Sequence, residues 1–235
     1  MGSVQVGLFY KEIDDPLDFV TVEVSDTAAV NDLVLPDTPD CNNLPSNIFI
    51  ELSQPLNADN DSKIWGAEIE YEQQFTSLPG WASGLGARVN YTYTDGTKTV
   101  TRVSPAFPDG VQLTRPLTGS PKQSGTISLT YNRNGFDALL AYTAQDRRFS
   151  GIESFGLDRY FDEFDSLDLR IEYFGELSDQ EFKIFLEGND LLRGTNEATV
   201  TQSRGGDYGV PRYNGLSATY LGGRSLVLGL SATFQ

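Results

Sequence analysis

Apolar and polar residues alternate along many short segments of this chain, and this alternation constrains its fold more than any other feature. In residues 85–93 every odd position is apolar or aromatic, and every even position is polar or glycine. Successive side chains of a β-strand point to opposite faces, so such a segment has one apolar face and one polar face. The pattern therefore predicts amphipathic β-strands.

The alternation recurs through the whole chain, with Phe185 as an apolar residue on an otherwise polar side. It is clear in residues 65–72, 126–131, 167–173, 182–188 and 225–234, and weaker in residues 4–11 and 136–145. From these segments we predict eight strands. They are residues 4–12, 63–75, 84–95, 123–133, 135–147, 164–175, 180–188 and 223–234.

Three features favour a membrane barrel over a soluble sheet. Several strands reach the ~9–11 residues that a tilted strand needs to cross a bilayer. Tyrosines occur near predicted strand ends, as in an interfacial aromatic belt. Short turns alternate with long loops, as in outer-membrane barrels. The tyrosines are Tyr10, Tyr71, Tyr93, Tyr131, Tyr142 and Tyr173. The short turns are residues 78–83, 132–135 and 175–180, and the long loops are about 13–62, 96–122, 148–163 and 189–222.

The polar faces of the predicted strands carry many charges. An eight-stranded barrel has an interior that side chains just fill, and burying so many charges there would be costly unless nearly all were paired. A wider, wetted barrel accommodates them, so we expect an all-β antiparallel transmembrane barrel segment, about eight strands of a larger barrel. The charged residues are Lys11, Glu68, Glu70, Glu72, Arg88, Asp168, Arg170, Glu172, Lys183 and Glu187.

Composition excludes several function classes. The chain has 33 Asp and Glu against 17 Lys and Arg, a net charge of −16, so a nucleic-acid-binding surface is not expected. It has no histidine, which removes Ser-His-Asp triads and most zinc sites. Cys41 is the single cysteine. We expect a protein that is not an enzyme and needs no cofactor.

Beyond these patterns, several short motifs follow one another in a distinctive order. They are Gly7-Leu8-Phe9-Tyr10-Lys11-Glu12-Ile13-Asp14, Gly66-Ala67-Glu68-Ile69-Glu70-Tyr71 with Phe75 and Leu78-Pro79-Gly80, Asn90-Tyr91-Thr92-Tyr93-Thr94-Asp95, Leu167-Asp168-Leu169-Arg170-Ile171-Glu172-Tyr173, Glu187-Gly188-Asn189-Asp190-Leu191-Leu192, and Gly223-Arg224. The order and spacing of these motifs resemble the C-terminal part of a TonB-dependent outer-membrane receptor. Within that family the sequence resembles the large receptors of the Xanthomonas and Caulobacter type.

The resemblance implies a large barrel with an N-terminal plug inside it. Neither a plug nor a TonB box is visible, so we expect residues 1–235 to be the C-terminal part of such a barrel, with the plug and earlier strands absent. Implied partners are outer-membrane lipid, the plug and remaining strands, TonB acting through the plug, and the barrel-assembly machinery. That machinery reads a terminal aromatic in the family; here Phe234 precedes Gln235.

The final long loop is the main candidate for ligand contact. Arginines and tyrosines in it suit stacking on sugars or holding an anionic metal chelate, although an ordinary exposed loop has the same composition. The candidate residues are Arg204, Asp207, Tyr208, Arg212 and Tyr213. The expected cargo is a small-molecule nutrient such as a siderophore or an oligosaccharide.

Other candidate sites have simpler explanations. The acidic groups Asp14, Asp15 and Asp18, and Asp59 and Asp61, could hold calcium, but they lack EF-hand spacing and fit a solvated loop better. Glu68, Glu70 and Glu72 are too closely aligned on one strand to flank a glycosidic bond, so a wall partnered by Arg88 or a plug is favoured. Cys41 is a lone thiol that could pair only outside this chain.

The leading hypothesis is a transport component: a barrel segment of an active nutrient receptor in the bacterial outer membrane. One alternative is a self-contained eight-stranded outer-membrane barrel with an adhesive or structural role. A soluble β-sandwich binding module is the other alternative.

Overall fold

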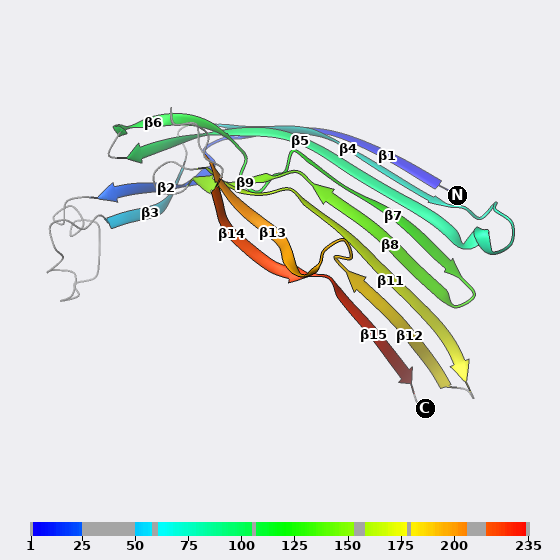
Figure 1. The fold of residues 1–235 in the computed structure, drawn as a ribbon. Coiled ribbons are helices and arrows are strands. Elements are labelled where there is room, and N and C mark those ends of the chain that lie inside the picture. Colours follow the sequence, from blue (N-terminus) through cyan, green and yellow to red (C-terminus); the bar gives the residue numbers. More distant parts are fainter. Residues whose placement is uncertain are drawn as a thin grey trace.

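A computed structural model describes residues 2–24, 50–57, 61–104, 107–152, 158–177, 180–205 and 215–233 of the chain. Antiparallel β-strands dominate these residues (Figure 1). The one helix among them is the short 3-10 helix η1 (Gly80–Gly84). No helix in the described residues is long and apolar enough to cross a membrane.

The main sheet contains the eight predicted strands, side by side in a curved wall (Figure 1). Boundaries differ from the prediction by a few residues, except that β5 continues past the expected end at residue 95 to Ser104. Each of the eight predicted strands is thus confirmed. In spatial order they are β1 (Gly2–Ile13), β4 (Ser62–Gln74), β5 (Leu85–Ser104), β7 (Gln123–Arg133), β8 (Phe136–Gln145), β11 (Phe164–Leu177), β12 (Gln180–Asn189) and β15 (Ser225–Thr233).

The wall formed by these eight strands is open. Its edges are β1 and β15, and each pairs with one neighbour only among the described residues. In a bilayer, the unpaired backbone groups of such edges would be costly because no water satisfies them. The open sheet therefore fits a segment of a larger barrel and argues against a self-contained eight-stranded one.

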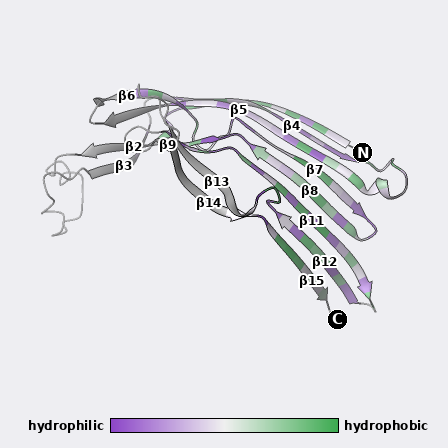
Figure 2. Ribbon diagram, in the orientation of Figure 1, coloured by the Kyte–Doolittle hydropathy of each residue, from purple (hydrophilic) through white to green (hydrophobic). Residues whose placement is uncertain are grey.

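Strand register joins the apolar sides of all eight strands into one continuous face. One row of cross-strand partners runs from Val4 on β1 through Tyr71, Val89, Ile127 and Tyr142 to Leu167 on β11. A neighbouring row continues from Leu169 on β11 through Gly188 to Leu226 on β15. Figure 2 shows the resulting alternation of hydrophobic and hydrophilic residues along the strands. Many of these side chains are well exposed, including Leu228 at 76%. Phe149 is the one buried hydrophobic residue in the described part, so the sheet has no core of its own on this face.

The short turn between β7 and β8 is built by Asn134 and Gly135. Both have positive φ, 52° and 80°. Two consecutive residues with positive φ match the type I′ turn that best fits the twist of a two-residue hairpin, and Asn-Gly is its preferred sequence. The short connection predicted here is confirmed.

The long connections, expected as loops, contain further strands. Antiparallel hairpins suit these segments because chain outside a bilayer must still satisfy its backbone groups. They are β2 (Leu17–Val24), β3 (Ile50–Asn57), β6 (Phe107–Pro116), β9 (Arg148–Ile152), β10 (Asp158–Phe161), β13 (Thr195–Gly205) and β14 (Gly215–Gly223). β2 pairs with β3, β6 pairs antiparallel with the outer part of β5 in the main sheet, and a separate sheet has the order β14-β13-β10-β9. Figure 1 shows β2, β3 and β6 projecting from the end opposite the short turns.

Candidate functional site

The polar face of the wall carries an ion network across β11 and β12. Glu172 Oε1 accepts from Arg170 Nη2 at 2.8 Å and from Lys183 Nζ at 3.2 Å. Arg170 also lies 3.6 Å from Glu187 Oε1, directly across the strand pair. This group of two cations and two carboxylates neutralises itself, which lets it line a polar surface at little desolvation cost.

The acidic row on β4 is only partly paired. Arg88 Nη2 lies 3.0 Å from Glu72 Oε1, and the two residues are register partners. The predicted partnership of this row with Arg88 is confirmed for Glu72. Glu68 and Glu70 face Gly7 and Gln5 on β1 instead, and neither forms an ion pair with a described residue.

Aromatic rings on the polar face lie over glycines of the neighbouring strand. A Cβ added at Gly66 would be 2.5 Å from the Phe9 ring, and one added at Gly229 would be 2.1 Å from the Phe185 ring. Lys183 Nζ lies 5.2 Å from the centre of the Phe185 ring. Phe185, the exception to the sequence alternation, thus occupies space that the opposite glycine leaves free.

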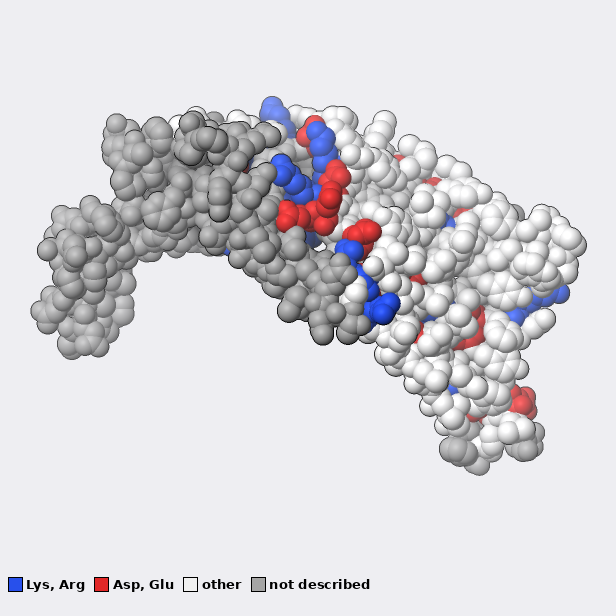
Figure 3. Space-filling model, in the orientation of Figure 1, with Lys and Arg blue, Asp and Glu red and all other residues white. Residues whose placement is uncertain are grey.

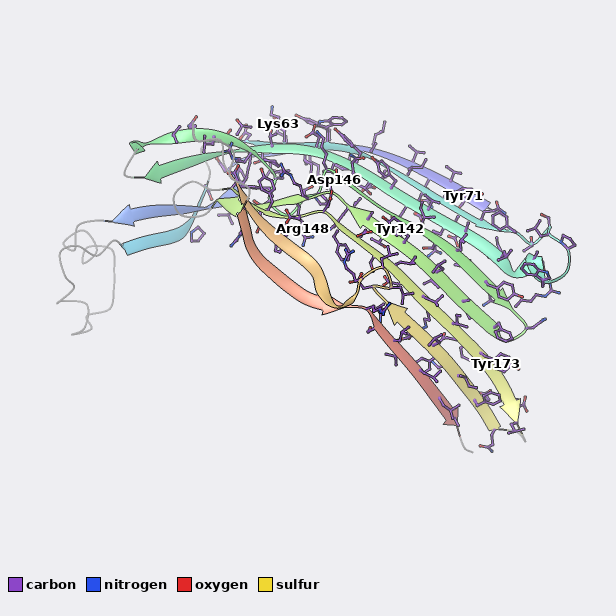
Figure 4. All side chains as sticks on the ribbon, in the orientation of Figure 1. Lys63, Tyr71, Tyr142, Asp146, Arg148 and Tyr173 are labelled. Atoms are coloured by element: carbon purple, nitrogen blue, oxygen red, sulfur yellow. The ribbon has the colours of Figure 1, made fainter. Side chains whose placement is uncertain are left out.

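Aromatic side chains gather toward both ends of the wall. Phe136 and Tyr173 pack at 4.7 Å between ring centres, near the short turns, and Trp65 and Tyr93 at 5.3 Å, near the long hairpins. Figure 4 places Tyr71 and Tyr173 toward the short-turn end and Tyr142 between the two ends. Tyr142 lies three residues before the end of its strand at Gln145, and its hydroxyl donates to Asp165 Oδ2 at 3.4 Å.

Polar contacts missed by sequence reasoning fix the end of β12. Asp168 Oδ1 accepts from Ser166 Oγ and from the Asp190 amide, both at 2.9 Å, and Arg193 Nη2 lies 2.9 Å from Asp165 Oδ1. Asp190 has a φ of 54°, the left-handed conformation that Asp tolerates better than most residues. The motif at residues 187–192 is therefore a turn tied to β11.

The candidate ligand loop lies mostly outside the described residues. Arg204 belongs to β13, where its backbone is paired opposite Arg159 of β10. Asp207, Tyr208, Arg212 and Tyr213 fall outside the described part of the chain, as do Cys41, Asp59 and Phe234. Their proposed roles stay predictions.

The calcium hypothesis covers residues on both sides of the β2–β3 hairpin. Asp14 and Asp15 follow β1, Asp18 belongs to β2, and Asp61 precedes β4. No group of three acidic, histidine or cysteine side chains in the described segments is arranged to hold a metal ion.

A curved antiparallel sheet with one apolar face, one charged face, short turns at one end and long hairpins at the other is the wall of a β-barrel. The family model described as "TonB dependent receptor-like, beta-barrel" matches residues 1–191 of the 235. The chain belongs to this family, whose members are outer-membrane β-barrels. The match does not extend to β13, β14 and β15, and it does not distinguish the Xanthomonas and Caulobacter type. No curated protein and no solved structure matches the chain.

Proposed function

We propose that this chain forms part of the wall and the extracellular surface of an active nutrient receptor in the bacterial outer membrane. The observation that carries the proposal is the continuous apolar face, which register extends over eight strands opposite a charged face. Lipid on one side and water or protein on the other are the surroundings that such a wall requires. The role is transport, and no catalytic step is assigned to the chain.

The partners follow from membership of the family. Outer-membrane lipid covers the apolar face, and further strands complete the barrel beyond the edges β1 and β15. A plug domain fills the lumen, contacts the charged face and passes the pull of TonB to the bound cargo. The barrel-assembly machinery inserts the strands, with Phe234 as the terminal aromatic.

Topology labelling tests this proposal. In a Cys41→Ser background, Thr118→Cys places a thiol beside the long hairpins, and Asn134→Cys places one in a short turn. Thr118 is exposed, so the thiol is accessible there. We expect a membrane-impermeant maleimide to label position 118 in intact cells and position 134 only after the outer membrane is opened.

Two further measurements complete the test. The chain should be recovered in the outer-membrane fraction, and uptake of the cargo by cells carrying the complete receptor should stop when TonB is deleted. Labelling of position 134 in intact cells, or of both positions equally, would contradict the proposed orientation. Recovery of the protein in the aqueous fraction would contradict the membrane location itself.

A further inference from the structure

A cavity of about 470 Å³ lies where the wall meets the strands of the long connections, called the outer hairpins below. Its walls come from β5, β6, the segment leading into β7, the connection between β8 and β9, β9, β10 and the connection between β10 and β11. On the visible face, Figure 3 shows charged side chains gathered beside the grey atoms, whereas the surface toward the short turns is mainly white. Figure 4 places Asp146 and Arg148 in the same region.

The cavity is held open by buried contacts between segments far apart in sequence. Arg115 Nε lies 2.9 Å from Asp158 Oδ1, and their side chains are only 13% and 9% exposed. Phe149 is 2% exposed, and its ring packs edge-on against Tyr160 at 5.5 Å. The Gly119 amide donates to the Phe149 carbonyl at 2.8 Å. A cavity with walls fixed in this way is preformed, which lowers the entropic cost of binding.

The cations that line the cavity already have partners. Arg115 is paired with the buried Asp158. Lys122 Nζ lies 3.4 Å from Asp95 Oδ2, and the hydrogen bond and charge of that carboxylate raise the pKa of Lys122 above its ordinary value. The Arg147 guanidinium lies 4.6 Å from the centre of the Tyr160 ring. Carboxylates thus neutralise Arg115 and Lys122, whereas Arg147 keeps its charge, because a tyrosine ring does not neutralise a guanidinium.

The carboxylates Asp146 and Glu163 line the same cavity, and neither forms a side-chain ion pair or hydrogen bond with a described residue. The hydroxyl-bearing residues Thr94, Thr114 and Ser120 also line it. The unpaired charges of the lining are therefore two carboxylates against one guanidinium, that of Arg147, and the hydroxyl groups can both donate and accept. These groups match a ligand that presents many hydroxyl donors, and the excess of carboxylates disfavours a ligand that carries carboxylates or phosphates.

We propose that this cavity is a cargo subsite for a neutral, polyhydroxylated ligand, an oligosaccharide, and that it disfavours anionic chelates. The inference rests on the proposed receptor function and narrows its cargo. Asp146 and Glu163 accept hydrogen bonds from sugar hydroxyls, and the hydroxyl side chains exchange further bonds with the sugar. The Arg147–Tyr160 stack forms one wall of the cavity.

The test measures binding by isothermal titration calorimetry to the complete receptor barrel in detergent micelles. The probes are neutral hexasaccharides of glucose, xylose and mannose, with hexagalacturonate as an anionic ligand of the same length. We expect at least one neutral hexasaccharide to bind, and hexagalacturonate to bind more weakly. Asp146→Asn and Glu163→Gln should each weaken neutral binding by roughly tenfold, because each replaces a charged acceptor by a neutral one.

Matched variants keep the inference falsifiable. Glu176→Gln removes an exposed carboxylate at the short-turn end and should leave binding unchanged. Asp146→Lys combined with Glu163→Lys should shift the preference toward hexagalacturonate. Binding of no neutral hexasaccharide, or a tighter fit of hexagalacturonate to the unaltered barrel, overturns the inference. Topology labelling reports on the receptor wall independently of sugar binding, so the two proposals can fail separately.

Discussion

The ring of Phe185 occupies the place on the polar face where a side chain of Gly229 would stand. Phe185 on β12 and Gly229 on β15 are register partners, and a Cβ at position 229 would lie 2.1 Å from the ring. The pair explains two features of the sequence together: an apolar residue on a polar face and a glycine in the middle of a strand. A glycine in a strand weakens it unless another group uses the space, and here the ring does so.

Gly229→Ala should therefore destabilise the barrel by about 1–3 kcal/mol, the usual cost of inserting a methyl group into a filled site. Gly7→Ala is the matched control, because a Cβ there would meet only Glu68 side-chain atoms, at 3.7 Å and beyond. Urea unfolding of the barrel extracted into detergent, followed by fluorescence, gives both values. Equal stability of the two variants would show that the ring moves aside freely.

Glu172 stabilises the polar face because it holds two cations at once. Glu172→Gln leaves Arg170 and Lys183 without their shared carboxylate and should cost about 1–3 kcal/mol. Glu70→Gln is the control on the same face, since Glu70 has no ion-pair partner among the described residues. Unfolding midpoints of the two variants measure the difference. A loss as large for Glu70→Gln as for Glu172→Gln would contradict the role of the network.

The wall strands could be predicted from the sequence because the bilayer itself imposes an alternation of apolar and polar residues. Leu169 must face lipid and Arg170 must not, so a period of two is enforced along the strand. Strand ends were less accurate: β5 continues to Ser104 because it pairs with β6 beyond the wall.

Strand β13, which lies outside the wall, could not be predicted because its sequence does not alternate. Residues 195–205 include only Ala198 and Val200 as apolar residues. A search for apolar–polar alternation therefore has no signal to find in this strand. The pair of Arg115 and Asp158 was equally invisible, because 43 residues separate the two and only the folded hairpins bring them together. Side-chain contacts of this kind follow from register, which composition does not specify.

Neighbouring leucines on β8 test which face meets lipid. Leu139 and Leu140 are each 38% exposed but lie on opposite faces: Leu139 is opposite Arg170, and Leu140 is opposite Leu169. Leu140→Glu should cost about 1–2 kcal/mol because it moves a carboxylate into hydrocarbon. Leu139→Glu places the carboxylate beside a guanidinium and should be neutral or stabilising. Heat-modifiable gel mobility after folding into lipid vesicles measures the folded fraction of each variant. A smaller folded fraction for Leu139→Glu than for Leu140→Glu would show that Leu139, and not Leu140, faces the lipid.

The last prediction concerns the ion pair that joins the β5–β6 hairpin to β10. Because Arg115 and Asp158 are both largely buried, Asp158→Asn leaves a guanidinium without its counter-charge, which costs about 3–5 kcal/mol for a fully buried pair. We expect the hairpin to detach locally, since the wall strands keep their own pairing. Limited trypsin digestion of intact cells should then cleave after Lys98 or Arg102, in the β5 arm of the hairpin, much faster than in the unaltered receptor.

The exposed pair of Lys122 and Asp95 supplies the control for this experiment. Its side chains are 55% and 39% exposed, so Asp95→Asn should cost at most about 1 kcal/mol and leave the digestion rate unchanged. Exchanging the charges, with Arg115→Asp and Asp158→Arg in one chain, should restore much of the protection. Rapid cleavage in the exchanged variant would show that packing around the pair, rather than its charge, holds the hairpin in place.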